Sequence, residues 1–386
     1  MEKSIEILVR DLRGVSDVNA HYRAIDNLVA RGEVEQVVAF ARAVEEQPNI
    51  GAESWALEAV FDRVVRALAF RDTVDAAAAA IDLGLSSRKK STQSARSKLT
   101  VSRELAYMLA TGQSKATLLT LLKRLEYNSE LEDVLACWTQ ELVVRGVDIS
   151  GEPSVNTLWG RLSETQHPLA ALPLHLATIE RGLRKCLPQE GLGGSSYGLP
   201  YGPSERVDAE STQALPFIEH VVAADIPPRL GAASVVANWQ EESNGRSETK
   251  TFRFDRPIAP RTLTARFLKN LPLLCLDGTD AEQVTVRALP AEQALCMLFS
   301  AAANGGAYNR GRRAAYGRLE LWQTVRAWVG DPAPYIDRLA EKAAQWAWYA
   351  FDAPSAWFEQ VAWDLGIAAL SPDGMELSVL AATDTD

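Results

Sequence analysis

The chain of 386 residues is long enough for two or three domains, and its composition, 47% hydrophobic and 23% charged, is that of a globular protein rather than a disordered one. The formal net charge of −10 argues against non-specific binding to nucleic acid or to an anionic membrane surface, and would suit a basic protein partner. The sequence shows neither a long uncharged apolar run nor the apolar core of a signal peptide, so we expect a cytoplasmic protein that does not span a membrane.

Cysteine and histidine are sparse. The cysteines are scattered without a C-x-x-C pair, which is typical of free, buried thiols in a reducing compartment. The histidines form no H-x-x-x-H pair and have no cysteine at ligand spacing. We therefore expect neither a metal site nor a cofactor. The cysteines are Cys137, Cys186, Cys275 and Cys296, and the histidines are His21, His167, His175 and His220.

Residues 1–185 carry apolar positions at three- and four-residue spacing in one segment after another, as in NAHYRAIDNLVARG and ESWALEAVFDRVVRALAF. This spacing predicts amphipathic helices. Short connectors favour antiparallel neighbours, as in helical hairpins or an irregular solenoid, although no known repeat signature is present. We therefore predict a mainly α protein that starts with an all-helical, repeat-like region.

A basic stretch runs from Arg88 to Arg124, with nine Lys or Arg residues and a single acidic one. If this stretch begins as one helix, Lys89, Arg96 and Arg103 share a face. A solvated face that meets the acidic first helices explains the pattern most simply. The alternatives are an acidic protein partner and nucleic acid. Nucleic acid is the less favoured of these, because aromatic residues do not interleave with the basic ones.

Residues 186–211 are rich in Gly, Pro and Ser, which predicts a long loop between two domains. Residues 194–198, GSSYG, match the G-x-S-x-G nucleophile elbow around Ser196. That elbow needs a strand before the serine and a helix after it, whereas here a predicted helix precedes and a proline-rich segment follows. The only histidine downstream is His220. A surface loop is the better interpretation, and we assign no catalytic residue.

Residues 212–386 mix strand and helix patterns, which predicts an α+β domain with short antiparallel strands ending in a β-hairpin. The Asn-Gly pair at 244–245 predicts a hairpin, Pro290 a helix start, and Gly305-Gly306 the end of that helix. The predicted strands are at 235–240, 252–254, 283–289 and on either side of the Pro-Asp-Gly turn at 372–374, and the predicted helices are at 290–304, 314–329, 334–350 and 355–366.

Tryptophan is concentrated near the C-terminus, where six of ten lie between positions 322 and 363. On a helix over 334–350, Leu339 and Trp346 would be buried and Trp348 would point to the opposite face. Trp348 then lies either under the final hairpin or at an interface as an exposed anchor.

The segment ANGGAYNRGRRAAYGR, residues 303–318, has the glycine spacing of a phosphate-binding loop, but Arg312 and Arg313 stand where a lysine and a hydroxyl residue are needed. We interpret it as a helix connector. Its cations lie near a helix start, where the macrodipole disfavours them, so an anion should compensate. The anion is either one of the chain's own carboxylates or a ligand or acidic partner. The residues of such an anion or partner site are Tyr308, Asn309, Arg310, Arg312, Arg313 and Arg318.

Four C-terminal segments resemble an uncharacterised bacterial family, a domain of unknown function seen mostly in actinomycetes. The segments are ANGGAY at 303–308, AYGRLELW at 315–322, WDLGIAAL at 363–370 and LAATDTD at 380–386. The resemblance covers the C-terminal third of the chain and implies a bacterial, cytoplasmic protein with no assigned activity. It also draws attention to the tail, where Asp384 and Asp386 would supply an internal anion for the arginines.

We therefore expect a protein-interaction or regulatory module, with an immunity or defence role among the options. The alternative is an enzyme or binding protein for a small anionic ligand, with the 191–203 loop folded over the arginines. An interaction protein should pair its arginines internally and expose apolar surface. An enzyme should show a pocket where arginine, tyrosine and serine converge.

Overall fold

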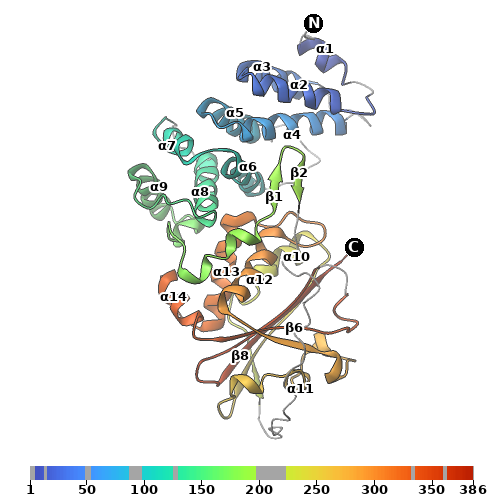
Figure 1. The fold of residues 1–386 in the computed structure, drawn as a ribbon, viewed down its shortest axis with the longest axis vertical. Helices are drawn as coiled ribbons and strands as arrows, with labels where there is room; N and C mark the ends of the chain where they lie inside the picture. Colours follow the sequence, from blue (N-terminus) through green and yellow to red (C-terminus); the bar gives the residue numbers. More distant parts are fainter. Residues whose placement is uncertain are drawn as a thin grey trace. The chain divides into compact units, whose positions relative to one another are not determined.

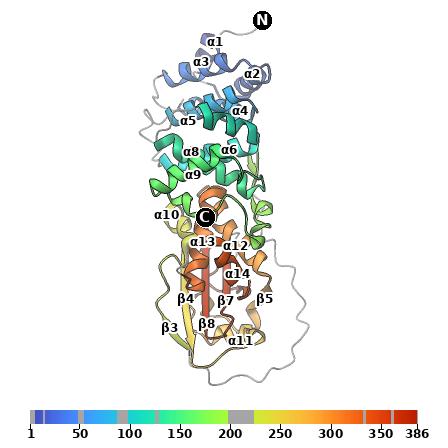
Figure 2. The same cartoon turned by 90° about the vertical axis from the view of Figure 1, so that its left-hand side faces the viewer.

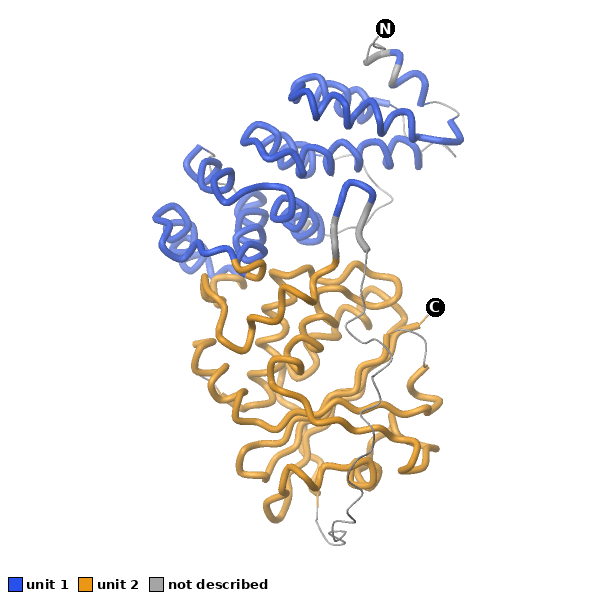
Figure 3. Tube along the Cα trace, in the orientation of Figure 1, with its two compact units in different colours: residues 1–143, 147–167, 189–196 blue, residues 144–146, 168–188, 197–386 orange. Residues whose placement is uncertain are grey.

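A computed structural model describes residues 5–12, 15–47, 54–86, 98–124, 129–196, 223–331, 335–359 and 363–385. The predicted class is confirmed, because the protein is mainly α with an α+β C-terminal part. The chain divides into two compact units (Figure 3). The helical unit comprises residues 1–143, 147–167 and 189–196, and the α+β unit comprises residues 144–146, 168–188 and 197–386.

The helical unit has the packing pattern of a solenoid. From α2 to α6, each helix packs against the next one in the chain, and α1 to α5 also pack against the next but one. In such stacks each element contacts only its near neighbours and leaves its outer surface open. The helices (Figure 1) are α1 (Ile5–Arg10), α2 (Asn19–Ala30), α3 (Val34–Glu45), α4 (Ser54–Phe70), α5 (Val74–Ser86), α6 (Lys98–Gly112), α7 (Lys115–Arg124), α8 (Ser129–Val144) and α9 (Pro153–Glu164).

The basic helix face predicted around Arg103 is wrong where the structure describes it. Helix α6 begins at Lys98, so Lys89 and Arg96 lie outside the described residues. Arg103 is only 3% exposed, and its guanidinium donates a hydrogen bond to the Thr100 hydroxyl at 3.0 Å. The physical reason is that α6 packs against both α4 and α5, which buries the face that the spacing pattern gave to solvent.

A small hairpin of β1 (Gln189–Gly191) and β2 (Gly194–Ser196) belongs to the helical unit. Two arginines of α4 hold its tip. The Arg66 guanidinium donates to the carbonyl of Gly191 at 3.1 Å, and that of Arg63 donates to the carbonyl of Leu192. Arg63 also pairs with Asp26 of α2. Residues 189–196 of the predicted long loop are therefore a hairpin that belongs to this unit.

The α+β unit is built on an antiparallel sheet with the strand order β3-β4-β8-β7-β6-β5 among the described residues. The two C-terminal strands predicted around the Pro-Asp-Gly turn are its centre, with Ile367 opposite Leu380. The strands are β3 (Ala223–Ile226), β4 (Arg246–Phe254), β5 (Thr285–Leu289), β6 (Ala347–Asp352), β7 (Trp363–Leu370) and β8 (Glu376–Asp384).

Both faces of this sheet are covered. Helices α12 (Ala291–Asn304), α13 (Arg313–Val329) and α14 (Ile336–Ala343) lie on one face (Figure 2). Helix α11 (Ala265–Lys269) and three short 3-10 helices lie on the other, over a core that includes Phe252, Phe351 and Leu377. The 3-10 helices on this side are η7 (Pro260–Thr262), η8 (Leu274–Leu276) and η9 (Ala281–Gln283).

The segment 168–188, which we expected at the end of the helical region, belongs to the α+β unit. It forms three short 3-10 helices, η3 (Pro168–Ala171), η4 (Thr178–Glu180) and η5 (Leu183–Cys186). Both η4 and η5 pack against α12, and η3 packs against α13.

Two predicted elements have the wrong type. The expected strand at 235–240 is the 3-10 helix η6 (Ser234–Val236) followed by α10 (Ala237–Glu242). Its buried residues include Val235, Val236 and Trp239, which is helical rather than alternating spacing. The expected helix at 355–366 is absent from the described residues, and strand β7 begins at Trp363 instead. Gly366 lets this strand approach its neighbour, since a Cβ there would lie 2.1 Å from the Phe351 carbonyl oxygen.

Of the two alternatives for Trp348, the structure shows a buried side chain and not an exposed anchor, although the predicted helix around it is wrong. The helix expected over 334–350 ends at Ala343, and Trp348 lies in strand β6. A strand alternates its side chains, so Trp348 faces the helical layer while its neighbour Tyr349 faces the other core. Trp348 is 1% exposed, stacks on Trp328 with ring centroids 5.8 Å apart, and donates its indole N–H to the Ala343 carbonyl at 2.9 Å.

Candidate functional site

The arginine-rich segment connects α12 to α13 as a tight loop organised by its own asparagine. Gly305 and Gly311 have positive φ angles of 84° and 65°. The side-chain oxygen of Asn309 accepts hydrogen bonds from the backbone N–H groups of Gly311 at 2.8 Å and Gly306 at 3.3 Å. Its amide nitrogen donates to the carbonyl of Asn238 at 3.0 Å. The Asn309 side chain therefore holds the loop together through hydrogen bonds to the backbone, whereas the side chain of Tyr308 is exposed.

The acidic C-terminus meets this loop through the backbone. The carboxylate of Asp384, which is almost fully buried, accepts a hydrogen bond from the Ala307 N–H at 2.7 Å. A Cβ on Gly306 would lie 1.8 Å from the same carboxylate, so only glycine fits there. Asp384 thus supplies an internal anion, as the tail suggested, but it contacts a main-chain donor. Asp386 lies outside the described residues.

Arg312 has three carboxylate partners of its own. Its guanidinium pairs with Glu320 of α13 at 3.0 Å, with Glu241 at 2.5 Å, and with Glu242. Burial alone would lower the pKa of Arg312, but the negative charges of Glu320, Glu242 and Glu241 outweigh it and raise that pKa. The anion that compensates this cation at the start of α13 is therefore internal.

Arg318 is paired inside the core. Arg318 and Glu180 are both 0% exposed, and the guanidinium donates to the two carboxylate oxygens at 2.7 and 2.8 Å. The same guanidinium donates to the carbonyls of Pro173 and His175 at 2.9 and 2.7 Å. Glu180 also accepts from the Trp322 indole N–H at 2.7 Å. This is a fully hydrogen-bonded buried ion pair that ties segment 168–188 to α13.

The four arginines do not form one site. Arg310 is exposed, Arg313 is 3% exposed at the first residue of α13 with a φ of 57°, and the carboxylate partners of Arg312 differ from that of Arg318. Sequence spacing alone could not separate Arg312 from Arg318, because Glu241, Glu242 and Glu180 lie far from them in the chain. The predicted cluster is a set of different structural contacts.

The Ser196 motif does not adopt the geometry of a nucleophile elbow over its described residues. Ser196 lies in strand β2, paired with Gln189 of β1, whereas an elbow places its serine at a sharp turn. The turn of this hairpin is at residues 192–193. Tyr197, Gly198 and His220 lie outside the described residues, as does most of the 191–203 loop.

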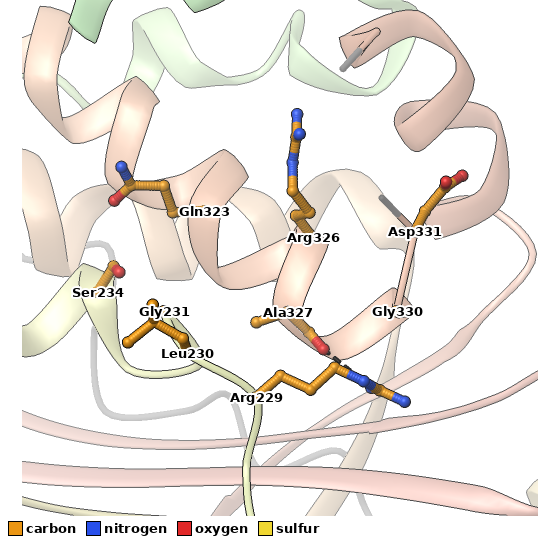
Figure 4. Close-up of a pocket in the computed structure, with 9 residues that line it drawn as sticks. All are labelled: Arg229, Leu230, Gly231, Ser234, Gln323, Arg326, Ala327, Gly330 and Asp331. Carbon is orange, nitrogen blue, oxygen red and sulfur yellow. Dashed lines mark hydrogen bonds between the residues drawn. The ribbon is translucent and has the colours of Figure 1, made fainter. Parts of the chain in front are cut away.

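An open depression of about 600 Å³ lies at the C-terminal end of α13 (Figure 4). Arg229 lines it but is committed to other groups, donating to the carbonyls of Ala327 at 2.9 Å and Trp328 at 3.1 Å and pairing with Glu376 at 2.7 Å. A cation at a helix C-terminus satisfies carbonyls that have no helical partner. Leu230 on the rim is fully exposed. The convergence of arginine, tyrosine and serine expected of an enzyme is not found in this depression.

The helical unit carries a feature that the sequence reasoning missed. Trp55 at the start of α4 is 46% exposed, and Glu58 and Asp62, three and seven residues on, are exposed as well. These three residues, which we call the Trp55 face, share one side of the helix. The signal was present in the helix spacing, because α4 buries Ala56, Val60 and Val64, and Trp55 falls outside that stripe.

The part of the helical unit that carries the Trp55 face has an acidic composition. Residues 5–86 contain fourteen acidic and eight basic residues. Some exposed carboxylates make no ion pair with any residue in the described part of the chain. These are Glu35, Glu46, Glu58 and Asp75.

Residues 19–386 match a family described as a family of unknown function, DUF6183. The likeness noted in the C-terminal third therefore extends over nearly the whole chain, helical unit included. No curated protein and no solved structure matches the chain. None of the helices among the described residues is both long and apolar enough to cross a membrane.

Proposed function

The chain belongs to the DUF6183 family of unknown function, and we propose that it is a cytoplasmic protein-interaction module whose helical unit binds a basic protein through the Trp55 face. The single observation that carries this proposal is an exposed tryptophan beside two exposed carboxylates, Glu58 and Asp62, on one side of a helix in a solenoid-like stack. We place this activity in a regulatory, immunity or defence setting, where one protein acts by binding another.

Trp55 has the properties of a binding anchor. Tryptophan is enriched among the residues that dominate interface energetics, because it buries a large rigid surface and its N–H provides a polar contact. Trp55 is the only tryptophan among the strongly exposed large apolar residues in the described part of the chain. Glu58 and Asp62 beside it would steer a positively charged surface toward it.

The alternative, a small anionic ligand on the arginine loop, has weaker support. Arg312 already contacts Glu241, Glu242 and Glu320, and Arg318 contacts Glu180. An incoming phosphate or carboxylate would have to displace those carboxylates. Arg310 is the exposed arginine of the loop, and a single surface cation binds an anion weakly.

The test is capture of the partner from native cells with the full-length protein, followed by mass spectrometry of proteins and small molecules. We expect a stoichiometric basic protein that is retained at about 50 mM salt and lost at about 500 mM, because charge pairs on a surface are screened. The variant Glu58→Lys should lose the partner, whereas Arg312→Ala should retain it. A co-purifying anionic metabolite that Arg312→Ala loses would favour the alternative.

A further inference from the structure

One face of helix α12 lies against segment η5 and carries two polar groups and a thiol. Cys296, Ser300 and Asn304 follow each other at four-residue spacing, so they share that face. The Asn304 side-chain amide donates to the Cys186 carbonyl at 3.0 Å, which fixes the end of η5 to the end of α12. Helix α12 also packs along η5 as a whole.

The sulfur atoms of Cys186 and Cys296 both lie beside Gly182. The Cys186 sulfur is 3.8 Å from the Gly182 carbonyl oxygen, and a Cβ on Gly182 would be 3.0 Å from the Cys296 sulfur. Interaction with the Cys296 side chain is also the largest influence on the pKa of Cys186. Both thiols are free, Cys186 is buried, and Cys296 is partly exposed. This pair could not be predicted from the sequence, because the two cysteines are far apart in the chain.

The surroundings make the two thiols unequal. The hydrogen bond from Cys296 lowers the pKa of Cys186 against the opposing effect of burial, and Ser300 and Lys185 lower it further. The same hydrogen bond, together with burial, raises the pKa of Cys296. Cys186 is therefore the more acidic thiol of the pair and Cys296 the less acidic one.

The other two cysteines provide a comparison for this pair. Cys137 and Cys275 are fully buried, and burial raises the pKa of each thiol. Thiols of this kind are inert toward oxidants, because the thiolate is the reactive species. They are internal controls for the reactivity of the pair.

We propose that Cys186 and Cys296 are a redox modification site that closes to a reversible disulfide when a hydroperoxide oxidises it. The Cys186 thiolate attacks the peroxide, the O–O bond breaks, and Cys186 becomes a sulfenic acid while hydroxide leaves. Hydroxide takes the Cys296 proton as water, and the Cys296 sulfur attacks the Cys186 sulfur. The S–O bond then breaks, and the departing hydroxide takes up a proton from solvent. Two thiols are oxidised and the peroxide is reduced to water.

The experiment treats the full-length protein with one equivalent of hydrogen peroxide, blocks the remaining thiols with N-ethylmaleimide, and maps disulfides by mass spectrometry without reduction. We expect a Cys186–Cys296 linkage that dithiothreitol reverses, with Cys137 and Cys275 alkylated once the protein is unfolded. The variant Cys296→Ser should stop at a sulfenic acid on Cys186, trapped by dimedone. The variant Cys186→Ser should consume peroxide at least about tenfold more slowly. The inference is overturned if the disulfide does not form, or if Cys137 and Cys275 oxidise as fast.

A positioning variant keeps both thiols. Gly182→Ala introduces a Cβ 3.0 Å from the Cys296 sulfur, which must shift away, so disulfide formation should slow while sulfenic acid at Cys186 accumulates. The matched control is Gly160→Ala in α9, where an added Cβ meets nothing within 4 Å. Unchanged disulfide formation in Gly182→Ala would contradict the proposed geometry. If a serine variant fails to fold, the alkylation rates of the wild-type cysteines still decide, because Cys186 must react fastest at neutral pH.

Discussion

Arg318 and Glu180 meet with both side chains at 0% exposure, and each has several further hydrogen bonds. Removing one partner leaves a buried charge without compensation, which costs about 3–5 kcal/mol. We therefore expect Arg318→Ala to lower the free energy of unfolding by about that amount, measured by urea denaturation with tryptophan fluorescence. The exposed Arg261→Ala should change it by less than about 0.5 kcal/mol. A loss below about 1 kcal/mol in Arg318→Ala would contradict the geometry.

Asp72 gives a pH-dependent prediction at the same scale. Burial raises its pKa, but hydrogen bonds from the Ser114 N–H at 2.9 Å and the Thr117 hydroxyl at 2.8 Å outweigh burial and lower that pKa below the unfolded value. A carboxyl group whose pKa is lower in the folded state stabilises that state at pH values above its pKa in the unfolded chain. This contribution disappears as the pH falls through the folded-state pKa. Asp72→Asn should therefore be less stable than wild type near pH 7, with the difference shrinking as pH falls below the unfolded pKa and disappearing below the folded one. A difference that does not depend on pH would refute this role.

Among the elements, α12 and α13 pack closely because of a glycine. A Cβ on Gly317 of α13 would lie 2.8 Å from the Cβ of Ala303 and 2.9 Å from its Cα. Gly317→Ala should therefore destabilise the protein by about 1–3 kcal/mol, as overpacking does. In α9, where an added Cβ meets nothing, Gly160→Ala should stabilise it by about 0.5–1 kcal/mol. Thermal denaturation of both variants measures these opposite changes in stability, and equal changes in Tm would contradict the prediction.

The sequence predicted elements well where one pattern dominates. The helices α12 and α13 and the final two strands follow from spacing, Pro290, Gly305 and the Pro-Asp-Gly turn. The prediction from sequence failed over residues 344–366. Strands β6 and β7 are rich in alanine and tryptophan there, and such a composition also occurs in helices. Both strands are buried in the sheet, so the alternation that marks a half-exposed strand is lost. Pairing of β6 with β5 and β7, and of β7 with β8, decides their conformation, and pairing is not local information.

At the scale of the whole molecule, the boundary of the α+β unit lies before segment 168–188, because that segment supplies Glu180. We expect a fragment of residues 168–386 to fold cooperatively and a fragment of residues 186–386 to remain largely unfolded, since Arg318 is then buried without its partner. Circular dichroism and thermal melting distinguish the two. Equal stability of both fragments would show that Glu180 does not define the boundary.

The candidate site was less predictable than the fold. The sequence located the arginines, but not Glu180 or Glu241, which neutralise Arg318 and Arg312 from distant positions in the chain. Only the folded chain shows that these cations are already paired. Trp55 was readable from the spacing of α4, because it lies outside the buried stripe, yet its exposure depends on how the neighbouring helices stack.

Isothermal titration of the captured partner tests the central claim most directly. It compares the affinity of the partner for Trp55→Ala with its affinity for the wild-type protein and for Leu230→Ala. Trp55 and Leu230 are exposed apolar residues on different units, so their replacement removes apolar surface from different places. We predict that Trp55→Ala raises Kd by at least about 30-fold, the loss of an anchor worth about 2 kcal/mol, and that Leu230→Ala leaves it unchanged. An unchanged Kd for Trp55→Ala, or a loss of binding confined to Leu230→Ala, would contradict the account.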